Sequence, residues 1–275
     1  MSEKFADLHI HTHYSDSTAS PQDVIKEAHA CGLSCIAIAD HDTIDGIAPT
    51  REAAKEYHIE VITAVELSTE VNGKDVHVLG YCFNEKDDTL IQQLTLMQNF
   101  RVERMKKMIE KLSGLGIKNI ELDEVCSLTK SASVGRPHLA AVLVQKGVVT
   151  DRKTAFNKYL AEGAAAYVPK LKQTTQEGIR LIRQAGGVAV LAHPALTQMD
   201  QFIPSFVESG LQGLEVYYAN TPQPMVNFYA GLAKKHNLLM TGGSDAHGKA
   251  KRNTFIGKMK IPSELVEKLK MAARV

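Results

Sequence analysis

The stretch "DLHIHTHYSD" (residues 7–16) carries three histidines at alternating positions, His9, His11 and His13, with Asp16 at its end. Alternate residues of an extended strand point to the same face, so the three imidazoles would lie together. Neutral imidazole is the side chain that most commonly binds metal ions in proteins. A polar edge strand with solvated histidines would show the same pattern, and this stretch by itself does not separate the two interpretations.

Seven short apolar runs predict buried strands, because they are rich in Val and Ile and are bounded by Gly, Pro or polar residues. The runs are FADLHIH, CIAIADHD, VITAVELS, VHVLGY, GVAVLAHP, GLEVYY and LLMTGGSDAH. Amphipathic helical patterns such as SPQDVIKEAHACG lie between them, which favours parallel β-α-β units. The carboxyl ends of parallel barrel strands form one rim, where active sites gather. Most of the runs end in His, Asp or Glu, so the sequence predicts that these side chains converge on one metal site.

A charged helical stretch interrupts this alternation from about residue 88 to residue 165. We expect an all-helical insertion there, within a barrel made of residues 1–87 and 166–275, because a single α/β barrel of this length is ordinary. The insertion could serve as a structural cap. It could also act as a lid that brings basic residues over the rim and onto a substrate.

The composition of the chain excludes several classes of protein. The 275 residues are 44% hydrophobic and carry a formal net charge of +1, so no global basic field indicates binding to long nucleic acids. No apolar run is long enough to predict a membrane span, and the first residues do not resemble a signal peptide. The four cysteines show no CxxC spacing. We therefore expect reduced thiols, a cytoplasmic protein, no membrane contact and no obligate protein partner.

The motifs DLHIHTHYSD, DHDT, ELS, VHVLGY, AHP and GSDAH, in this order, resemble those of the polymerase and histidinol phosphatase (PHP) family. The resemblance covers nearly the whole chain. It implies an α/β fold, namely a distorted seven-stranded (β/α) barrel with a helical insertion, and three divalent metal ions, typically manganese, iron or zinc. Within the family, the likeness is greatest to bacterial phosphoesterases that act as 3′,5′-nucleotide bisphosphate phosphatases or 5′→3′ exoribonucleases.

The resemblance also implies nine metal ligands, with Glu66 as a bridge between the first two ions. Taken ion by ion, the expected ligands are His9, His11 and Asp245; Glu66, His77 and His193; and Asp16, His41 and His247. Glu66, His193 and Asp245 are also the expected catalytic residues.

The first motif departs from the family pattern at two positions. Ser17 stands where the family often has glycine, which alters a turn but removes no ligand, and His13 has no counterpart. Residues behind the ligands can orient them through the second ring nitrogen of a histidine. The candidates for that role are Asp7, Asp40, Asp42 and Glu215.

A phosphate ester is an anion that repels hydroxide, and clustered divalent ions both lower the pKa of bound water and neutralise the phosphoryl oxygens. We therefore expect a metal-bound hydroxide as the nucleophile and protein cations for the remaining charge. The segments SVGRPHLA and YVPKLK offer Arg136, His138, Lys170 and Lys172. Arg suits bidentate phosphate recognition and Lys acts as a point charge. GRPH also resembles a phosphate-contacting segment of related phosphoesterases, although Arg136 could simply be a surface residue at a helix start.

The expected function is hydrolysis of nucleotide phosphates. The substrate would be a 3′,5′-bisphosphate nucleotide or a short 5′-phosphorylated single-stranded oligonucleotide, degraded from its 5′ end. One alternative is a phosphatase of a small metabolite such as histidinol phosphate. Another is a non-catalytic PHP module that binds metals or nucleic acid within a polymerase complex, but here all nine ligand positions are filled.

Overall fold

The computed structural model describes residues 4–171, 173–251 and 253–273. Its strands are β1 (Phe5–Ile10), β2 (Leu33–Ile38), β3 (Glu60–Val71), β4 (Lys74–Tyr81), β5 (Val188–Leu191), β6 (Gly213–Tyr218), β7 (Leu239–Gly243) and β8 (Ile261–Pro262). Its α-helices are α1 (Pro21–Ala30), α2 (Ile47–Ala54), α3 (Asp88–Gly114), α4 (Leu122–Cys126), α5 (Arg136–Gln145), α6 (Arg152–Ala155), α7 (Thr175–Gln184), α8 (Pro194–Thr197), α9 (Ile203–Glu208), α10 (Gln223–Lys235) and α11 (Ser263–Ala272).

The strands of the described chain form one sheet with the order β7-β6-β5-β4-β3-β2-β1-β8. The residues that follow β7 reach back to β1, where the N–H of Asp245 donates to the carbonyl of His9 at 2.8 Å and the N–H of His11 donates to the carbonyl of Ala246 at 3.0 Å. The sheet is thus a nearly closed barrel, which confirms the predicted fold class. The seven longer strands coincide with the seven apolar runs, and β8 adds a two-residue antiparallel edge to β1.

The alternation of strands and helices suggested that all strands are parallel. The structure differs from this expectation at β4. β4 runs antiparallel to both β3 and β5. It follows β3 through Asn72 and Gly73, whose φ angles of 49° and 75° form the two-residue turn that favours Asn-Gly in a hairpin. As a result, the first half of β4, with His77, pairs with the last half of β3 beside Glu66. His77 therefore reaches the rim from the beginning of its strand and not from its end.

Local capping explains where several helices begin. Ser20 and Asp23 form a reciprocal capping box at the start of α1, and Thr174 and Glu177 form one at the start of α7. Apolar faces of such helices pack on the outside of the sheet, where Ile182 of α7 is fully buried. A second apolar cluster joins the strands to α11.

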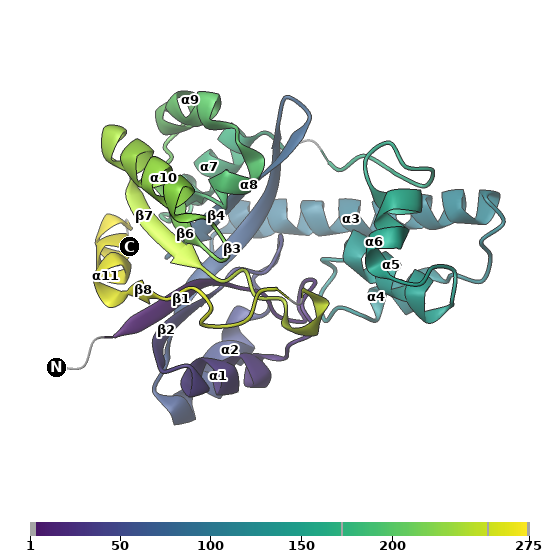
Figure 1. The fold of residues 1–275 in the computed structure, drawn as a ribbon, viewed down its shortest axis with the longest axis horizontal. Helices are drawn as coiled ribbons and strands as arrows, with labels where there is room; N and C mark the ends of the chain where they lie inside the picture. The colour runs from purple at the N-terminus through teal and green to yellow at the C-terminus, as the bar shows by residue number, and fades with distance from the viewer. Residues whose placement is uncertain (1–3, 172, 252, 274–275) are drawn as a thin grey trace.

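The helical insertion has an apolar cluster of its own. Met108 and Leu112 of α3 and Leu139 and Leu143 of α5 are fully buried in it. Figure 1 shows α4, α5 and α6 gathered along the part of α3 that projects to one side of the barrel. The second half of α3 thus packs with α4, α5 and α6, whereas Leu90, Leu94 and Met97 in its first half belong to the apolar cluster of the barrel.

Hydrogen bonds fasten the insertion to the loops that carry the candidate ligands. The N–H of Lys130 donates to the carbonyl of His13 at 2.8 Å, and the hydroxyl of Ser131 donates to the carbonyl of Tyr14 at 2.5 Å. The hydroxyl of Ser133 donates to the carbonyl of His41. The segment between α4 and α5 thus lies directly against the rim.

Within the described residues, no helix combines the length and the apolar character needed to cross a membrane.

Candidate metal centre

The backbone at the rim is shaped to bring ligands from different strands together. A Cβ atom on Gly243 would lie 2.4 Å from the backbone nitrogen of His9, so only glycine lets the end of β7 approach β1 this closely. His193 and Asp245 adopt left-handed backbone conformations, with φ angles of 30° and 52°. Such conformations are costly for residues with a side chain and cluster at functional sites. These sharp turns direct both side chains back across the rim.

His9, His11 and Asp245 form the first group of candidate ligands. Nε2 of His9 lies 3.1 Å from Nε2 of His11, and Oδ1 of Asp245 lies 3.2 Å from the His11 nitrogen. Oε2 of Glu66 is 3.3 Å from both ring nitrogens. Two imidazole nitrogens that face each other beside two carboxylates present converging lone pairs. This arrangement suits a cation at their centre.

Glu66 connects separate groups through its two oxygens. Oε1 lies 2.9 Å from Nδ1 of His77 and 2.9 Å from Nε2 of His193, whereas Oε2 lies 3.1 Å from Nδ1 of His41. The side chain is 1% exposed. A buried carboxylate that faces histidines on both sides is arranged as a bridge between two cation positions.

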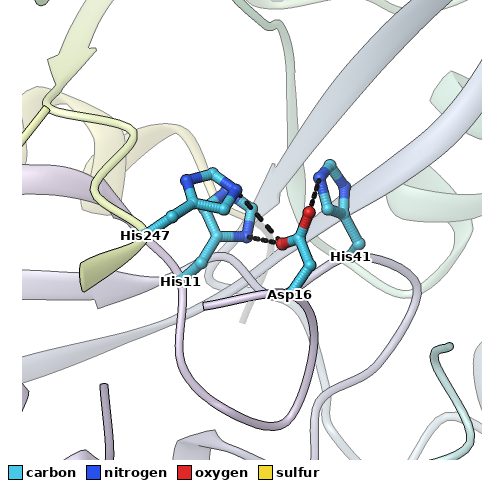
Figure 2. A group of neighbouring side chains, drawn as sticks. All are labelled: His11, Asp16, His41 and His247. Atoms are coloured by element: carbon cyan, nitrogen blue, oxygen red, sulfur yellow. Dashed lines mark ion pairs between the residues drawn. The ribbon is translucent and has the colours of Figure 1, made fainter. Parts of the chain in front are cut away.

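Asp16 is the centre of the third group, which Figure 2 shows with His11, His41 and His247 around it. Oδ1 of Asp16 lies 3.1 Å from Nε2 of His247 and 4.0 Å from Nδ1 of His11, and Oδ2 lies 4.0 Å from Nε2 of His41. Neither Oδ1 of Asp16 nor Nδ1 of His41 has a hydrogen-bond partner among the described residues. Buried polar atoms without partners are rare and are expected where an ion binds.

The donor atoms therefore fit divalent metal ions. In each of three groups the possible ligand atoms lie within 4.8 Å of one another, and the groups include eight of the nine expected ligands. The ninth, His193, contacts Glu66 instead. His11 and His41 each belong to two groups, whereas the family resemblance implied one ion for each. Imidazoles mixed with carboxylates, without thiolates, suit zinc, manganese or iron.

The carboxylates at this centre remain ionised. Burial by itself raises the pKa of Glu66, but His41, His77 and His9 outweigh it and hold this pKa well below its usual value. Asp16 and Asp245 behave in the same way. Burial raises their pKa values, but the surrounding histidines, His247 first, outweigh burial and hold both values well below the usual range. A concentration of buried anions is the charge pattern that divalent cations require.

The imidazoles differ in their protonation. Burial lowers the pKa of His41 to about 3, although Glu66 and Asp16 oppose this effect, so its ring is neutral and ready to bind metal. Burial also lowers the pKa of His11, but hydrogen bonds to Asp245 and Glu66 prevail and raise it to about 9. Metal binding at His11 therefore displaces a proton.

Two buried residues hold the candidate ligands from behind. Oε1 of Glu215 lies 2.9 Å from Nδ1 of His9, and Oε2 accepts the backbone N–H of His193 at 2.7 Å. The hydroxyl of Tyr218 donates to Oδ2 of Asp245 at 2.8 Å. The sequence suggested Glu215 for such a role and missed Tyr218, three residues later in β6.

The other aspartates suggested as partners of ligand histidines have different roles. Asp7 accepts the backbone N–H groups of Ser244 and Gly257, both at 2.9 Å. Asp40 accepts the N–H of Thr12 at 2.7 Å and so fixes the turn after β1. The third, Asp42, pairs with an arginine of α3. That interpretation was wrong for all three, because backbone donors and cations lie closer to these carboxylates than ligand rings do.

A cleft of about 310 Å³ extends from the metal centre toward the insertion, and we call it the first lobe. Its wall includes His77 and His193 together with four cationic side chains. The cations are Arg101, Arg104, Arg136 and Lys170. Oδ2 of Asp75 lies 3.1 Å from Nζ of Lys170 and 3.6 Å from Nη2 of Arg136, and Arg101 pairs with the buried Asp42. The first lobe therefore carries an excess of positive charge.

Arg104 is the least compensated of these cations. Its Nε donates to the carbonyl of Val168 at 2.7 Å, but its buried Nη2 has no hydrogen-bond partner within the described chain. Burial, followed by the charges of Arg136 and Arg101, lowers the pKa of Arg104 to about 10. Arg101 and Arg104 were not among the residues expected from the sequence, although their i, i+3 spacing on one helix face was the available signal.

Two of the residues expected to bind substrate line the first lobe, and a third does not. Arg136 and Lys170 line the first lobe, and the Arg136 guanidinium lies over the ring of Phe156, 5.7 Å from its centroid. His138 is 6% exposed, and its Nδ1 accepts the N–H of Gly135 at 2.9 Å, so it caps α5 and is not among the residues that line the cleft. Lys172, the remaining candidate, lies outside the described residues.

Residues 7–240 match the PHP domain family. The chain belongs to this family. The match includes five of the six motifs, from DLHIHTHYSD to AHP, and ends just before GSDAH, so the resemblance inferred from the sequence is confirmed.

Named proteins of the family are similar to the chain over nearly its full length. A 5'-3' exoribonuclease of Haemophilus influenzae is 34% identical over 252 residues, which cover 90% of this chain and 91% of the relative. A 3',5'-nucleoside bisphosphate phosphatase of Chromobacterium violaceum is 30% identical over 256 residues, which cover 91% and 90% of the two chains. The crystal structure of a putative metal-dependent phosphoesterase from Bifidobacterium adolescentis superposes with a TM-score of 0.89 at 31% identity, over 98% of this chain and 96% of that one.

Proposed function

We propose that this PHP chain is a metal-dependent phosphoesterase that hydrolyses nucleotide phosphates, both in 3′,5′-bisphosphate nucleotides and at the 5′-phosphorylated ends of single-stranded oligonucleotides. The observation that carries the proposal is the first lobe, in which Arg104, Arg136 and Lys170 lie beside the candidate metal groups. One phosphate can meet the metal centre while a neighbouring phosphate meets these cations. The names of the two curated relatives correspond to these two substrates.

The nine carboxylates and imidazoles of the centre would hold three ions of manganese, iron or zinc. Bound there, such ions lower the pKa of water and neutralise charge on phosphoryl oxygens. Glu66 keeps the two neighbouring positions together, and His193 and Asp245 present their side chains from sharply turned backbone. We assign these three residues as the catalytic ones.

The cations of the first lobe would select the substrate. Arg104 lines the lobe with a guanidinium whose buried Nη2 has no hydrogen-bond partner within the described chain, and the Arg136 guanidinium lies over the ring of Phe156, which restrains it. Lys170 and Arg136 share Asp75, at 3.1 Å and 3.6 Å, so each adds less free charge than Arg104. A phosphate held by fixed guanidinium groups makes charge-assisted hydrogen bonds, which are stronger than neutral ones.

The same placement of phosphates accounts for both substrates. A 5′-phosphate in the first lobe leaves the 3′-linked phosphorus at the metal centre. Water oxygen then joins this phosphorus while the bond from phosphorus to O3′ breaks, and O3′ takes up a proton. The products are a nucleoside 5′-monophosphate and either free phosphate or a shortened chain that still carries a 5′-phosphate. Digestion would therefore proceed from the 5′ end and depend on the 5′-phosphate.

A substrate panel with added Mn²⁺ tests the proposal. It contains a 3′,5′-bisphosphate nucleotide, a 5′-phosphorylated single-stranded oligonucleotide labelled at each end in turn, the same oligonucleotide without its 5′-phosphate, and histidinol phosphate. We expect rapid hydrolysis of the first two, with the mononucleotide released first from the 5′ label. Preference for histidinol phosphate, release from the 3′ label first, or indifference to the 5′-phosphate would each contradict the proposal.

We also propose that the protein works in the cytoplasm. Cys31, Cys35, Cys82 and Cys126 are all free thiols. Unpaired cysteines are typical of reducing compartments.

A further inference from the structure

The metal centre also opens into a second lobe of about 510 Å³, whose wall includes the candidate ligands Glu66, Asp245 and His247. The two lobes share a wall that includes Asp16, His41 and His193. They differ in their cations: Arg152 and Lys251 line the second lobe, and the four cations of the first lobe do not. The metal centre thus lies between two separate groups of positive charge.

Arg152 and Lys251 come from different parts of the fold. Arg152 begins α6 of the insertion, and its Nη1 donates to the carbonyl of Ala250 at 3.2 Å, in the loop that follows His247. Nζ of Lys251 contacts Oδ2 of Asp245 and lies 3.3 Å from the hydroxyl of Tyr218, while its side chain stays 43% exposed. The wall of this lobe is therefore built by both the insertion and the barrel. The insertion contributes Arg152 and the barrel contributes Lys251.

We propose that Arg152 and Lys251 bind the phosphate on the 3′ side of the scissile one, so that the preferred substrate is a 5′-phosphorylated single strand at least three nucleotides long. This inference rests on the proposed function. With the 5′-phosphate in the first lobe and the scissile phosphate at the metal centre, the remaining chain leaves through O5′ of the next nucleotide. The second lobe receives it, and its two cations meet the third phosphate.

The walls shared by the two lobes also suit a nucleic acid strand. Leu196 and Phe156 line both lobes, and Leu196 is 62% exposed, which is unusual for so large an apolar side chain. Apolar and aromatic surface beside a cationic groove gives bases a place to pack without reading their sequence. A free bisphosphate nucleotide would place no phosphate against Arg152 and Lys251.

The test compares a bisphosphate nucleotide, a 5′-phosphorylated dinucleotide and a 5′-phosphorylated trinucleotide, which alone has the third phosphate. The wild-type enzyme should show the highest kcat/KM on the trinucleotide. Arg152→Ala and Lys251→Ala should lower kcat/KM on the trinucleotide about tenfold more than on the dinucleotide, the loss expected for a charge-assisted contact. Each should also reduce the salt dependence of log KM for the trinucleotide by a slope of about 0.7.

Lys153→Ala and Lys249→Ala are matched controls, because both lysines are exposed neighbours on the same two segments and do not line the cleft. They should leave the preference for the trinucleotide unchanged. Metal content is measured in every variant, since Lys251 touches Asp245 and Arg152 does not. Equal losses on all substrates, or no loss in Arg152→Ala, would overturn the inference. Failure of the wild type to hydrolyse the bisphosphate and the dinucleotide would instead overturn the proposed function.

Discussion

Nδ1 of His9 lies 2.9 Å from Oε1 of Glu215, 206 residues later in the chain. The same carboxylate accepts the backbone N–H of His193 through its other oxygen at 2.7 Å. One buried side chain therefore fixes the ring orientation of one candidate ligand and the backbone of another. This relationship makes Glu215 the clearest positioning residue of the metal centre.

Glu215→Gln should lower metal affinity by about tenfold to a hundredfold, the loss typical of a carboxylate behind a ligand histidine. The amide keeps the shape of the side chain but loses the charge that orients the His9 ring. Titration of the metal-free protein with Mn²⁺ measures the effect. Glu208→Gln, at an exposed position on α9, is the matched control and should bind Mn²⁺ as the wild type does. Equal affinities for Glu215→Gln and the control would contradict this role.

Glu66→Gln should abolish hydrolysis, with a loss greater than about a hundredfold, because Glu66 contacts candidate ligands through both oxygens. The fold should survive, since the substitution keeps the volume of a fully packed side chain. Turnover, metal content and thermal unfolding are measured on the same preparation. Near-normal turnover with the metal retained would show that Glu66 is not a bridge.

His11→Ala and His13→Ala test which histidines of the first motif bind metal. His11 is fully buried and belongs to two candidate groups, whereas His13 is partly exposed and belongs to none of them. Loss of His11 should therefore remove metal and activity, and loss of His13 should change either by less than about threefold. Metal analysis after dialysis provides the measurement. If both variants lose metal equally, the assignment of this motif is wrong.

Arg104→Ala should weaken the binding of substrates with a second phosphate by roughly tenfold to a hundredfold, the value of a hydrogen bond to a charged group. Simple phosphate monoesters should lose far less, because they leave the first lobe empty of phosphate. KM values for a bisphosphate nucleotide and for a monoester give the comparison. Lys107→Ala, one turn further along α3 and exposed, is the control. An equal effect on both substrates would mean that Arg104 acts on the scissile phosphate or on stability.

Metal binding should release protons below about pH 9. Burial lowers the pKa of His11, but hydrogen bonds to Asp245 and Glu66 raise it to about 9, so the metal-free protein holds a proton there at neutral pH. Apparent metal affinity should rise with pH and level off above about 9. Calorimetric titrations in two buffers with different ionisation enthalpies count the protons. Absence of proton release near pH 7 would exclude His11 as the titrating group.

The same pKa shift has an opposite effect on the stability of the metal-free protein. The folded-state pKa of His11 lies above the value of about 6.5 in an unfolded chain. Its stabilising contribution is therefore complete below about pH 6.5 and is lost as the pH rises through 9. Denaturant unfolding of the metal-free protein at these pH values should show the decline, and a rise in stability over this window would contradict it.

Much of the barrel followed from local patterns in the sequence. Runs of Val and Ile bounded by turn residues predicted all seven longer strands, because strand burial leaves a short-range signature. Helix starts are also encoded locally, since the caps Ser20 of α1 and Thr174 of α7 act within one helical turn. The antiparallel direction of β4 was also encoded locally, because Asn72 and Gly73 are typical of a hairpin turn. The sequence prediction of parallel units did not take this turn into account.

The sequence by itself determined which residue types are available to hold metal, because each motif places His, Asp or Glu beside a strand end within a few residues. Only the tertiary structure decided how they combine: Glu66 meets histidines on both sides, and Arg104 joins the wall of the first lobe. These contacts join residues far apart in the chain. Their distances depend on how the strands close and how the insertion packs on the rim, and no local pattern specifies that packing.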